Sequence, residues 1–433
     1  MSTQEQPVLS RRSKIKRGFV LSVLTTLVFV TQVSSTAWAD AVTRWNEIAT
    51  TVTTPPAANI PPPYQSRIFA MTHAAIHDAL NAIDRRSRPY ALSIRPDPGA
   101  SPEAAVATAA YGVLVHEVPG QQALLDAELQ AALASIPDGE AKTRGVVIGH
   151  AAAAVIIALR SDDGSTAQVS YTPGTEPGDW QPTPPGFLPA LLPGWGDVTP
   201  FGLRIGAQFR PAPSPYFDLT SAAYTRDYNE IRSIGKADSP TRTAEQSEIA
   251  MFWYESSTIG WNRIARNVAV EQGLDPWSNA RLFGLLNLAI ADGYISTFEA
   301  KYFYNFWRPV TAIRAGDQDC NPHTIADPEW TSFLVTPPHP DNSSGHAVAG
   351  AGAAHVLAEF FDNDNICFTT TSGAPFPGIT RSFTSFSQAA QENADSRVYA
   401  GIHFRSACLD GLKQGTKVGR YTFNHFLKPA RGK

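Results

Sequence analysis

The sequence predicts an all-α protein built from two packed helical bundles, and three observations support this fold class. Alanine-rich runs such as AAVATAA and GHAAAAVIIALR favour helix, because alanine has the highest intrinsic helix propensity. Apolar residues recur at helical spacing on both sides of a proline-rich stretch in the middle of the chain. No convincing run of alternating apolar and polar residues, the pattern typical of strands, is present. About a dozen helices follow from these patterns, with the candidate functional residues in the C-terminal bundle.

The first 39 residues are typical of an export signal. Five Lys and Arg residues precede the apolar core GFVLSVLTTLVFV, and Ala37-Trp38-Ala39 fits cleavage before Asp40. The alternative is a membrane anchor, but the apolar run is short for a membrane span. A Ser-Arg-Arg triplet also has some likeness to a twin-arginine signal, so the export route stays open. We therefore expect a secreted or periplasmic protein, cleaved near Ala39.

Charge and cysteine content restrict the partners of the mature protein. Removing residues 1–39, which hold five basic residues and one acid, changes the formal net charge from −4 to −8. A mildly acidic protein is not built to bind nucleic acid or acidic membranes, and with no second long apolar stretch we expect no membrane association after cleavage. In an exported chain we expect one disulfide, between Cys320 and Cys367, and a free Cys408.

Residues 40–170 are predicted to form the N-terminal helical bundle. Helical patterns cover residues 66–83, 102–117, 121–135 and 138–161. Asp138 is placed to cap the last of these helices. His73 and His77 have a spacing that metal ligands on a helix can adopt, but apolar residues surround both, so we interpret them as structural.

Residues 171–240 are predicted to connect the two bundles. Eleven of the 34 prolines of the chain lie between Tyr171 and Pro215, together with many glycines. Because apolar residues persist there, we expect an ordered, irregular segment that covers the functional pocket; a plain interdomain linker is the alternative. Further helices are predicted at residues 219–233, 241–255, 262–271 and 277–295.

Residues 241–433 are predicted to form the C-terminal bundle, whose function depends on the stretch KYFYNFWRP, residues 301–309. Lys301 and Arg308 are seven residues apart, and on a continuous helix both would project from one face. Their aromatic neighbours leave little polar surface, and a buried cation requires a paired anion. The stretch therefore predicts an anion site; a solvated helix edge that carries two cations by chance is the alternative.

A second segment, PPHPDNSSGHA, supplies further anion-binding groups. Ser344 precedes the helical run AVAGAGAAHVLAEFF as an N-cap, and Gly345 permits close approach to the backbone. The free N–H groups of such a helix start bind anions. His346 adds a group that exchanges protons near neutral pH.

A third segment, SRVYAGIHFR, contains Arg397 and, six residues later, His403. On an unbroken helix these side chains would be about 240° apart. Either the chain breaks near Gly401, or the two side chains reach the site from different depths.

Together the three segments resemble one known signature: K-x6-R-P, then P-S-G-H, then S-R-x5-H. This signature is that of the type 2 phosphatidic acid phosphatase superfamily, which includes the vanadium-dependent haloperoxidases. Seven key residues match in order and spacing over about the last 130 residues, and the bundle of the family extends the resemblance upstream to about Thr241. The resemblance implies a haloperoxidase-like helical fold with the active site in the C-terminal bundle.

The resemblance also implies a role for each matched residue. The equatorial oxygens of vanadate, or of phosphate in the same site, would be held by Lys301, Arg308, Ser344, Gly345 and Arg397. His403 would bond the central atom, and His346 would be the acid–base group. His339 resembles the second active-site histidine of bromoperoxidases, where chloroperoxidases carry an aromatic residue. Glu245 occupies the place of an acid that braces an active-site arginine.

Two residues depart from the signature. Ser343 replaces the proline before Ser-Gly-His. Ala407 replaces the aspartate four residues after the last histidine, and Asp410 is the nearest substitute. In the phosphatases that aspartate orients and activates the nucleophilic histidine, so its absence counts more against a phosphatase.

Three functions agree with these residues. The first is a secreted vanadate-dependent haloperoxidase that oxidises bromide or iodide with hydrogen peroxide through Lys301, His339, His346 and His403. The second is a secreted acid phosphatase for small phosphate esters, in which His403 attacks phosphorus and His346 protonates the leaving group. The third is a non-enzymatic binding protein with a relic oxyanion pocket. The sequence leaves the halide preference, the organic substrate and the oligomeric state open.

Overall fold

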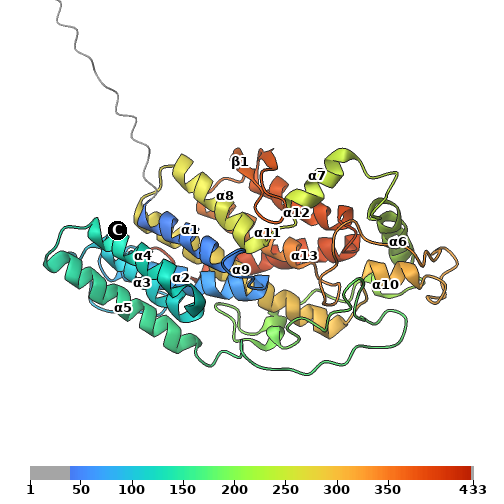
Figure 1. Ribbon diagram of the computed structural model, residues 1–433, viewed down its shortest axis with the longest axis horizontal. Helices are drawn as coiled ribbons and strands as arrows, with labels where there is room; N and C mark the ends of the chain where they lie inside the picture. Colours follow the sequence, from blue (N-terminus) through green and yellow to red (C-terminus); the bar gives the residue numbers. More distant parts are fainter. Residues whose placement is uncertain (1–39, 431–433) are drawn as a thin grey trace, which may run out of the picture. The chain divides into compact units, whose positions relative to one another are not determined.

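The chain is mostly α-helical in the computed structural model, which describes residues 40–430 (Figure 1). The helices of the N-terminal part are α1 (Ala41–Thr53), α2 (Pro62–Asn81), α3 (Pro102–Glu117), α4 (Gln122–Ala134) and α5 (Glu140–Arg160). Those of the C-terminal part are α6 (Ala222–Ile234), α7 (Ala244–Phe252), α8 (Ser257–Glu271), α9 (Pro276–Tyr304), α10 (Pro309–Arg314), α11 (Gly345–Phe360), α12 (Phe386–Tyr399) and α13 (Arg405–His425). The predicted all-α class is confirmed, and each predicted helical segment overlaps one of these helices.

One short β-hairpin departs from the prediction that no strands form. β1 (Phe368–Thr371) and β2 (Thr380–Phe383) pair antiparallel, with Phe368 opposite Phe383. Both rings are buried, with their centroids 5.3 Å apart. A strand of four residues is too short for alternation to be distinguished from chance, so the sequence pattern missed it.

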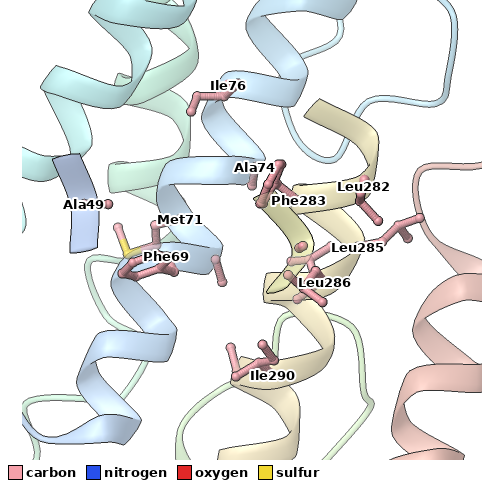
Figure 2. Close-up of a cluster of buried hydrophobic side chains, with 14 of the residues drawn as sticks. Ala49, Phe69, Met71, Ala74, Ile76, Leu282, Phe283, Leu285, Leu286 and Ile290 are labelled. Carbon is pink, nitrogen blue, oxygen red and sulfur yellow. The ribbon is translucent and has the colours of Figure 1, made fainter. Parts of the chain in front are cut away.

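Helix α9 is the central element of the core, and it lies between α2 and α11 (Figure 1). A helix that is apolar on all sides must be buried, and nearly every residue of α9 from Asn279 to Phe298 is buried. Figure 2 shows side chains of α2 and α9 meeting, with Ala49 of α1 beside them: Phe69, Met71, Ala74, Ile76, Leu282, Phe283, Leu285, Leu286 and Ile290. One continuous apolar core therefore contains helices from both ends of the chain. The boundaries of the two bundles stay a prediction.

The proline-rich segment contains single helical turns rather than long helices: η2 (Trp195–Asp197), η3 (Gly206–Phe209) and η4 (Pro215–Phe217). It is fixed to α9 by the buried carboxylate of Asp292. That carboxylate accepts N–H bonds from Phe201, Gly202 and Leu203 at 2.6–2.9 Å. Burial raises the pKa of Asp292 to about 6, although the hydrogen bonds from the three N–H groups lower this pKa.

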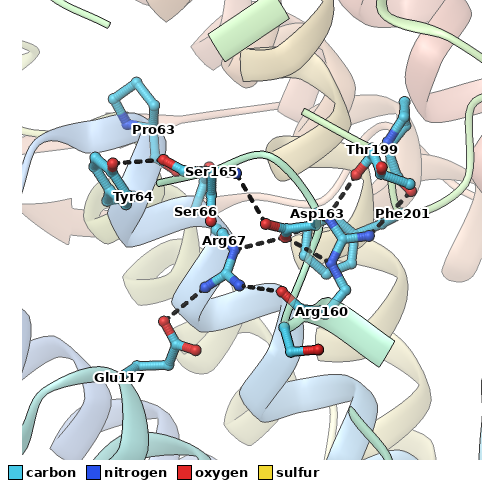
Figure 3. Close-up of polar contacts among 12 residues, drawn as sticks. Pro63, Tyr64, Ser66, Arg67, Glu117, Arg160, Asp163, Ser165, Thr199 and Phe201 are labelled. Carbon is cyan, nitrogen blue, oxygen red and sulfur yellow. Dashed lines mark hydrogen bonds and ion pairs between the residues drawn. The ribbon is translucent and has the colours of Figure 1, made fainter. Parts of the chain in front are cut away.

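A buried ion network joins α2, α3 and the end of α5 (Figure 3). The Nε atom of Arg67 donates to Asp163 Oδ2 at 2.8 Å, and its Nη1 donates to Glu117 at 2.6 Å. The Nε atom of Arg160 donates to the same Asp163 oxygen at 2.9 Å. Burial raises the pKa of Asp163, but the bonds from Arg67 and Ser165 outweigh burial and hold that pKa below its ordinary value.

Replacing Asp163 with alanine is expected to lower the free energy of unfolding by about 3 kcal/mol, because two buried guanidinium groups lose a shared partner. Urea unfolding followed by circular dichroism measures the loss, and Asp162→Ala, at an exposed neighbour, is the matched control. The folded pKa of Asp163 is depressed, so its stabilisation is present above the unfolded pKa and lost as the pH falls through the folded pKa. The difference between wild type and variant should therefore shrink in acid. A loss at neutral pH equal to that of the control would contradict this assignment.

Helix α5 corrects two expectations. It begins at Glu140 after Gly139, so Asp138 is not its cap; the Asp138 carboxylate pairs instead with Lys142 at 2.9 Å. In the part of the chain that the structure describes, α5 is also the one helix long and apolar enough to cross a membrane. The expectation that no second long apolar stretch exists is therefore wrong. One face of α5 packs along α3, and the rest of the helix is half-buried or exposed.

The three cysteines are all free thiols, with Cys320 and Cys367 exposed and Cys408 buried. The predicted disulfide between Cys320 and Cys367 is therefore wrong in this structure. The spacing of cysteines does not report how far apart the folded chain holds them. The export signal lies outside the described residues and stays a prediction.

Candidate active site

Lys301 and Arg308 are both fully buried, but they do not lie on one helix as predicted. Helix α9 ends at Tyr304, because Asn305 adopts a left-handed conformation with φ of 52°. Arg308 is extended and precedes α10, because the residue before a proline is disfavoured in helical conformation. The two cations therefore reach the site from the end of one helix and the start of the next.

Backbone carbonyls of the loop before α11 hold both cations. Lys301 Nζ donates to the carbonyls of Pro340 and Asp341, each at 2.9 Å. Arg308 Nε donates to the His339 carbonyl at 2.7 Å. An ammonium has three N–H donors, so one donor of Lys301 remains for a ligand.

Ser343, which stands where the signature has proline, fixes this loop by hydrogen bonds. Its carbonyl and its hydroxyl each lie 2.9 Å from Thr297 Oγ1 of α9. The hydroxyl also donates to Gln414 Oε1 of α13. The loop is therefore anchored on two helices without the proline ring.

The chain breaks between Arg397 and His403, which confirms the first of the two alternatives from the sequence. Helix α12 ends at Tyr399, Gly401 has a φ of 78°, and α13 begins at Arg405. A Cβ atom on Gly401 would lie 2.2 Å from the Gly235 carbonyl oxygen. Glycine is therefore required at this break, which lets Arg397 and His403 line the same cavity.

The predicted residues surround a cavity of about 400 Å³. Its walls include six of them: Lys301, His339, Gly345, His346, Arg397 and His403. Arg308 and Ser344 lie just behind this wall and are fully buried. Arg308 contacts two lining histidines through Nη1 and Nη2, and Ser344 is the N-cap of α11, immediately before Gly345. All eight predicted site residues are thus brought together.

Asp341 orients His403, which the sequence interpretation missed. The His403 Nδ1 atom lies 2.8 Å from Asp341 Oδ1, and the Tyr216 hydroxyl donates to Asp341 Oδ2 at 3.2 Å. Asp410, the substitute expected from the sequence, instead accepts a bond from the Asn342 amide at 3.1 Å. The signal was present in the sequence, because Asp341 is the acid inside HPDNSSGH.

The hydrogen-bond partners of the ring nitrogens indicate the tautomers of the three histidines. The Nδ1–H of His403 donates to Asp341, so Nε2 carries the lone pair and accepts from Arg308 Nη1 at 3.1 Å. The Nε2–H of His346 donates to the Glu255 carbonyl at 3.0 Å, which leaves Nδ1 as a proton acceptor. His339 Nδ1 lies 2.9 Å from Arg308 Nη2 and 3.2 Å from the Pro340 carbonyl, and the closer guanidinium donor favours Nδ1 as the acceptor, with the proton on Nε2.

The electrostatic balance of the site is strongly positive. Burial lowers the pKa of Lys301 well below its ordinary value, and the Arg308 guanidinium lowers it further. Burial also lowers the pKa values of Arg308 and Arg397 to about 10 each. The carboxylate that faces these cations is Asp341, and burial raises its pKa to about 7 despite Arg308. An anion in the cavity would supply the missing negative charge.

The histidines of the cavity are held neutral. Burial lowers the pKa values of His346, His403 and His339 well below the ordinary histidine value, and neighbouring cations lower them further. A neutral imidazole lone pair can bond a central atom or accept a proton. His346 Nδ1 makes no hydrogen bond among the described residues, whereas His403 Nε2 would exchange its bond from Arg308 Nη1 for a bond to a central atom.

Several buried donors at the cavity lack a hydrogen-bond partner within residues 40–430, and they include the Ser344 hydroxyl and Arg397 Nε. An unpaired buried polar group costs about 1–3 kcal/mol, so both are suited to a ligand oxygen. The N-terminus of α11 adds its free N–H groups beside them. The cavity therefore offers three cations, these unpaired donors and one imidazole lone pair. This set of groups fits a tetrahedral oxyanion such as vanadate or phosphate.

Glu245 does not brace an active-site arginine, so that expectation is wrong. It is an exposed residue that pairs with Arg381 at 2.7 Å. Glu255, ten residues later, lines the cavity and binds His346 through its backbone carbonyl. Its carboxylate pairs with Arg263. A backbone carbonyl leaves no side-chain signature, so the sequence could not reveal this contact.

Comparison with known proteins places the fold in a defined class. The chain resembles the crystal structure of a bacterial vanadium-dependent iodoperoxidase, with 27% identity and a TM-score of 0.79 over 91% of this chain and 97% of that one. A bacterial vanadium-dependent chloroperoxidase in its holo form shares the fold, with 21% identity and a TM-score of 0.72 over 88% and 95% of the two chains. The class is thus the helical-bundle fold of these peroxidases.

Two sequence comparisons agree with the structural likeness. A family model for the second helical-bundle domain of VCPO matches residues 281–432, which contain the whole predicted site. The vanadium chloroperoxidase of Curvularia inaequalis is 25% identical over 465 residues, covering 79% of this chain and 74% of that protein. These comparisons support the vanadium haloperoxidase family, as the signature predicted. The names of these relatives describe them as vanadium enzymes.

Proposed function

We propose that this protein is a secreted haloperoxidase that binds vanadate and oxidises bromide or iodide with hydrogen peroxide. The observation that carries the proposal is the positive pocket around His403 Nε2, with two unpartnered donors, Ser344 Oγ and Arg397 Nε. Secretion rests on the sequence of residues 1–39. Edman sequencing of the exported protein should begin at Asp40, and an intact N-terminus would argue against cleavage.

Each side chain has a defined part in this reaction. Bound vanadate supplies a Lewis-acidic centre that activates hydrogen peroxide towards halide without changing its own oxidation state. His403 Nε2 would be its direct ligand, while Lys301, Arg308 and Arg397 would offset the charge on its oxygens. His346 Nδ1 is the available base for the proton of incoming peroxide, because its Nε2–H is fixed on the Glu255 carbonyl.

The preference for bromide or iodide rests on His339 and on the relatives. His339 stands where chloroperoxidases carry an aromatic residue, and its Nε2–H is free of the Arg308 contact. The similar structure with the higher identity is an iodoperoxidase. A neutral histidine donor beside the cavity provides a polar wall in place of an aromatic one.

An acid phosphatase remains the second candidate, because the structure removes one objection to it. The missing aspartate at Ala407 suggested that nothing orients His403 for attack on phosphorus. Asp341 orients this histidine from a different segment, at 2.8 Å. A pocket whose cations and N–H donors would hold the oxygens of vanadate also suits the transition state of phosphoryl transfer.

One experiment separates the two functions. Purified mature protein is divided into a half loaded with orthovanadate and a half freed of metal and phosphate. Each half is given hydrogen peroxide with bromide or iodide and a halogen-trapping dye, and separately a chromogenic phosphate ester. We expect dye halogenation in the vanadate-loaded half. Ester hydrolysis by the metal-free half, without halogenation in the other half, would overturn the proposal and establish a phosphatase.

A further inference from the structure

A second cavity of about 530 Å³ adjoins the vanadate-binding cavity. The two cavities share five lining residues: Asn59, Pro62, Tyr254, Glu255 and Ser256. Tyr254 and Glu255 come directly before α8, and Pro62 begins α2. A molecule in the second cavity would therefore lie next to the site where halide is oxidised. Nothing in the reaction with peroxide and halide uses this space.

The lining of the second cavity suits an uncharged, largely apolar molecule. Its apolar walls are formed by Pro55, Ile60, Ile259, Ala374 and Pro375. Its charged residues neutralise each other, because Arg263 Nη1 donates to Glu255 at 3.2 Å and the Gly373 N–H donates to the same oxygen at 3.1 Å. Ligand pockets typically have this size and this combination of apolar walls with a few polar groups.

Gln65 lines this cavity and carries an acceptor without a partner among the described residues. Its side chain is 4% exposed, and its Nε2 donates to the Thr53 carbonyl at 2.9 Å, which sets the direction of the amide. Its Oε1 is buried without a partner among the described residues. An unpaired buried acceptor is unfavourable, and a ligand with an O–H donor would satisfy it.

We propose that the second cavity binds the organic molecule to be halogenated, an uncharged phenol whose hydroxyl donates to Gln65 Oε1. This inference rests on the proposed haloperoxidase function. The ring lies against Ile60 and Ile259, and the electron-rich carbons of a phenol react readily with electrophilic halogen. The protein then halogenates a bound acceptor in addition to releasing oxidised halide.

The proposed step is balanced. Peroxide oxidises halide to hypohalous acid, in which the halogen has the oxidation state +1. A ring carbon forms a bond to this halogen as the oxygen–halogen bond breaks, and the ring loses one proton. The departing hydroxide takes up that proton and leaves as water. The halogen is reduced by two electrons, and the ring carbon is oxidised by two.

Measuring phenol binding directly tests the inference without any halide oxidation. Phenol and toluene are titrated into vanadate-free protein, with ligand-detected NMR giving each affinity. We expect phenol to bind more tightly than toluene, and Gln65→Met, of similar volume, to lose about tenfold in phenol affinity with toluene unchanged. Ile259→Trp, which fills the cavity, should abolish binding of both. The control is Gln391→Met, at an exposed glutamine of α12.

Turnover gives the second measurement. With vanadate, peroxide and iodide alone, triiodide should form at the wild-type rate in Gln65→Met and Ile259→Trp, because neither residue lines the first cavity. With phenol added, both variants should show a raised KM for phenol iodination. Equal phenol affinity and equal KM in all proteins would overturn the inference. A wild type that forms no triiodide would instead refute the proposed function, and the NMR result would still decide whether the phenol site exists.

Discussion

Replacing His403 with alanine is expected to abolish vanadate binding. His403 Nε2 is the imidazole lone pair that faces the cation cluster, and its direction is fixed by the Nδ1–H bond to Asp341. In the variant no imidazole nitrogen would bond the central atom, so the oxyanion would be held by charge and hydrogen bonds alone. The loss should exceed the roughly 10- to 100-fold typical of removing a hydrogen-bond partner behind a ligand. Equilibrium dialysis with orthovanadate, followed by elemental analysis, measures it.

Two further variants make this result specific. His346→Ala should keep vanadate binding while losing halide oxidation, because His346 provides a base at Nδ1 rather than the direct ligand. His116→Ala, at an exposed histidine of α3, should match wild type in both measurements. Bound vanadate at the wild-type level in His403→Ala would refute the assignment of His403 as the direct ligand.

Replacing Asp341 with asparagine is expected to weaken vanadate binding by about 10- to 100-fold. Asparagine keeps an oxygen acceptor for the Nδ1–H of His403 but removes the negative charge that makes this imidazole a stronger ligand. It also removes the carboxylate that lies 3.9 Å from Arg308. The measurement is the dissociation constant for orthovanadate, with the melting temperature recorded to show that the fold is intact.

Asp410→Asn is the matched control for this prediction. Asp410 is the residue nearest to the position where the family signature carries its aspartate, but its carboxylate contacts Asn342 rather than His403. We expect its vanadate affinity to stay near that of wild type. A larger loss in Asp410→Asn than in Asp341→Asn would show that the roles of the two carboxylates are assigned wrongly.

The helical segments were predictable because helix formation depends on local spacing. Alanine-rich runs and apolar periodicity identified α3 and α5 to within a few residues. The end of α9 was not predictable in this way, because the turn at Asn305 and the extended residue Arg308 interrupt a pattern that reads as continuous. The β-hairpin was missed because four-residue strands carry too little pattern.

The sequence by itself determined which residues are predicted to bind the oxyanion. Lys301, Arg308, Ser344, Arg397 and His403 lie within three short segments, and their spacing inside each segment is a local property that the chain carries whatever its fold. The class of ligand followed from their charge and from the helix start at Ser344. The structure confirmed that these residues surround one site.

Only the tertiary structure decided which groups support them. Asp341 and His403 are 62 residues apart, and the Glu255 carbonyl is 91 residues from His346. The second cavity likewise combines α2, the start of α8 and the loop after β1. Such contacts arise when distant segments pack on a common core, so no local spacing encodes them. A backbone carbonyl and a cavity also have no residue type of their own, which is why the sequence identified the residues that surround the cavity but not the groups that support them.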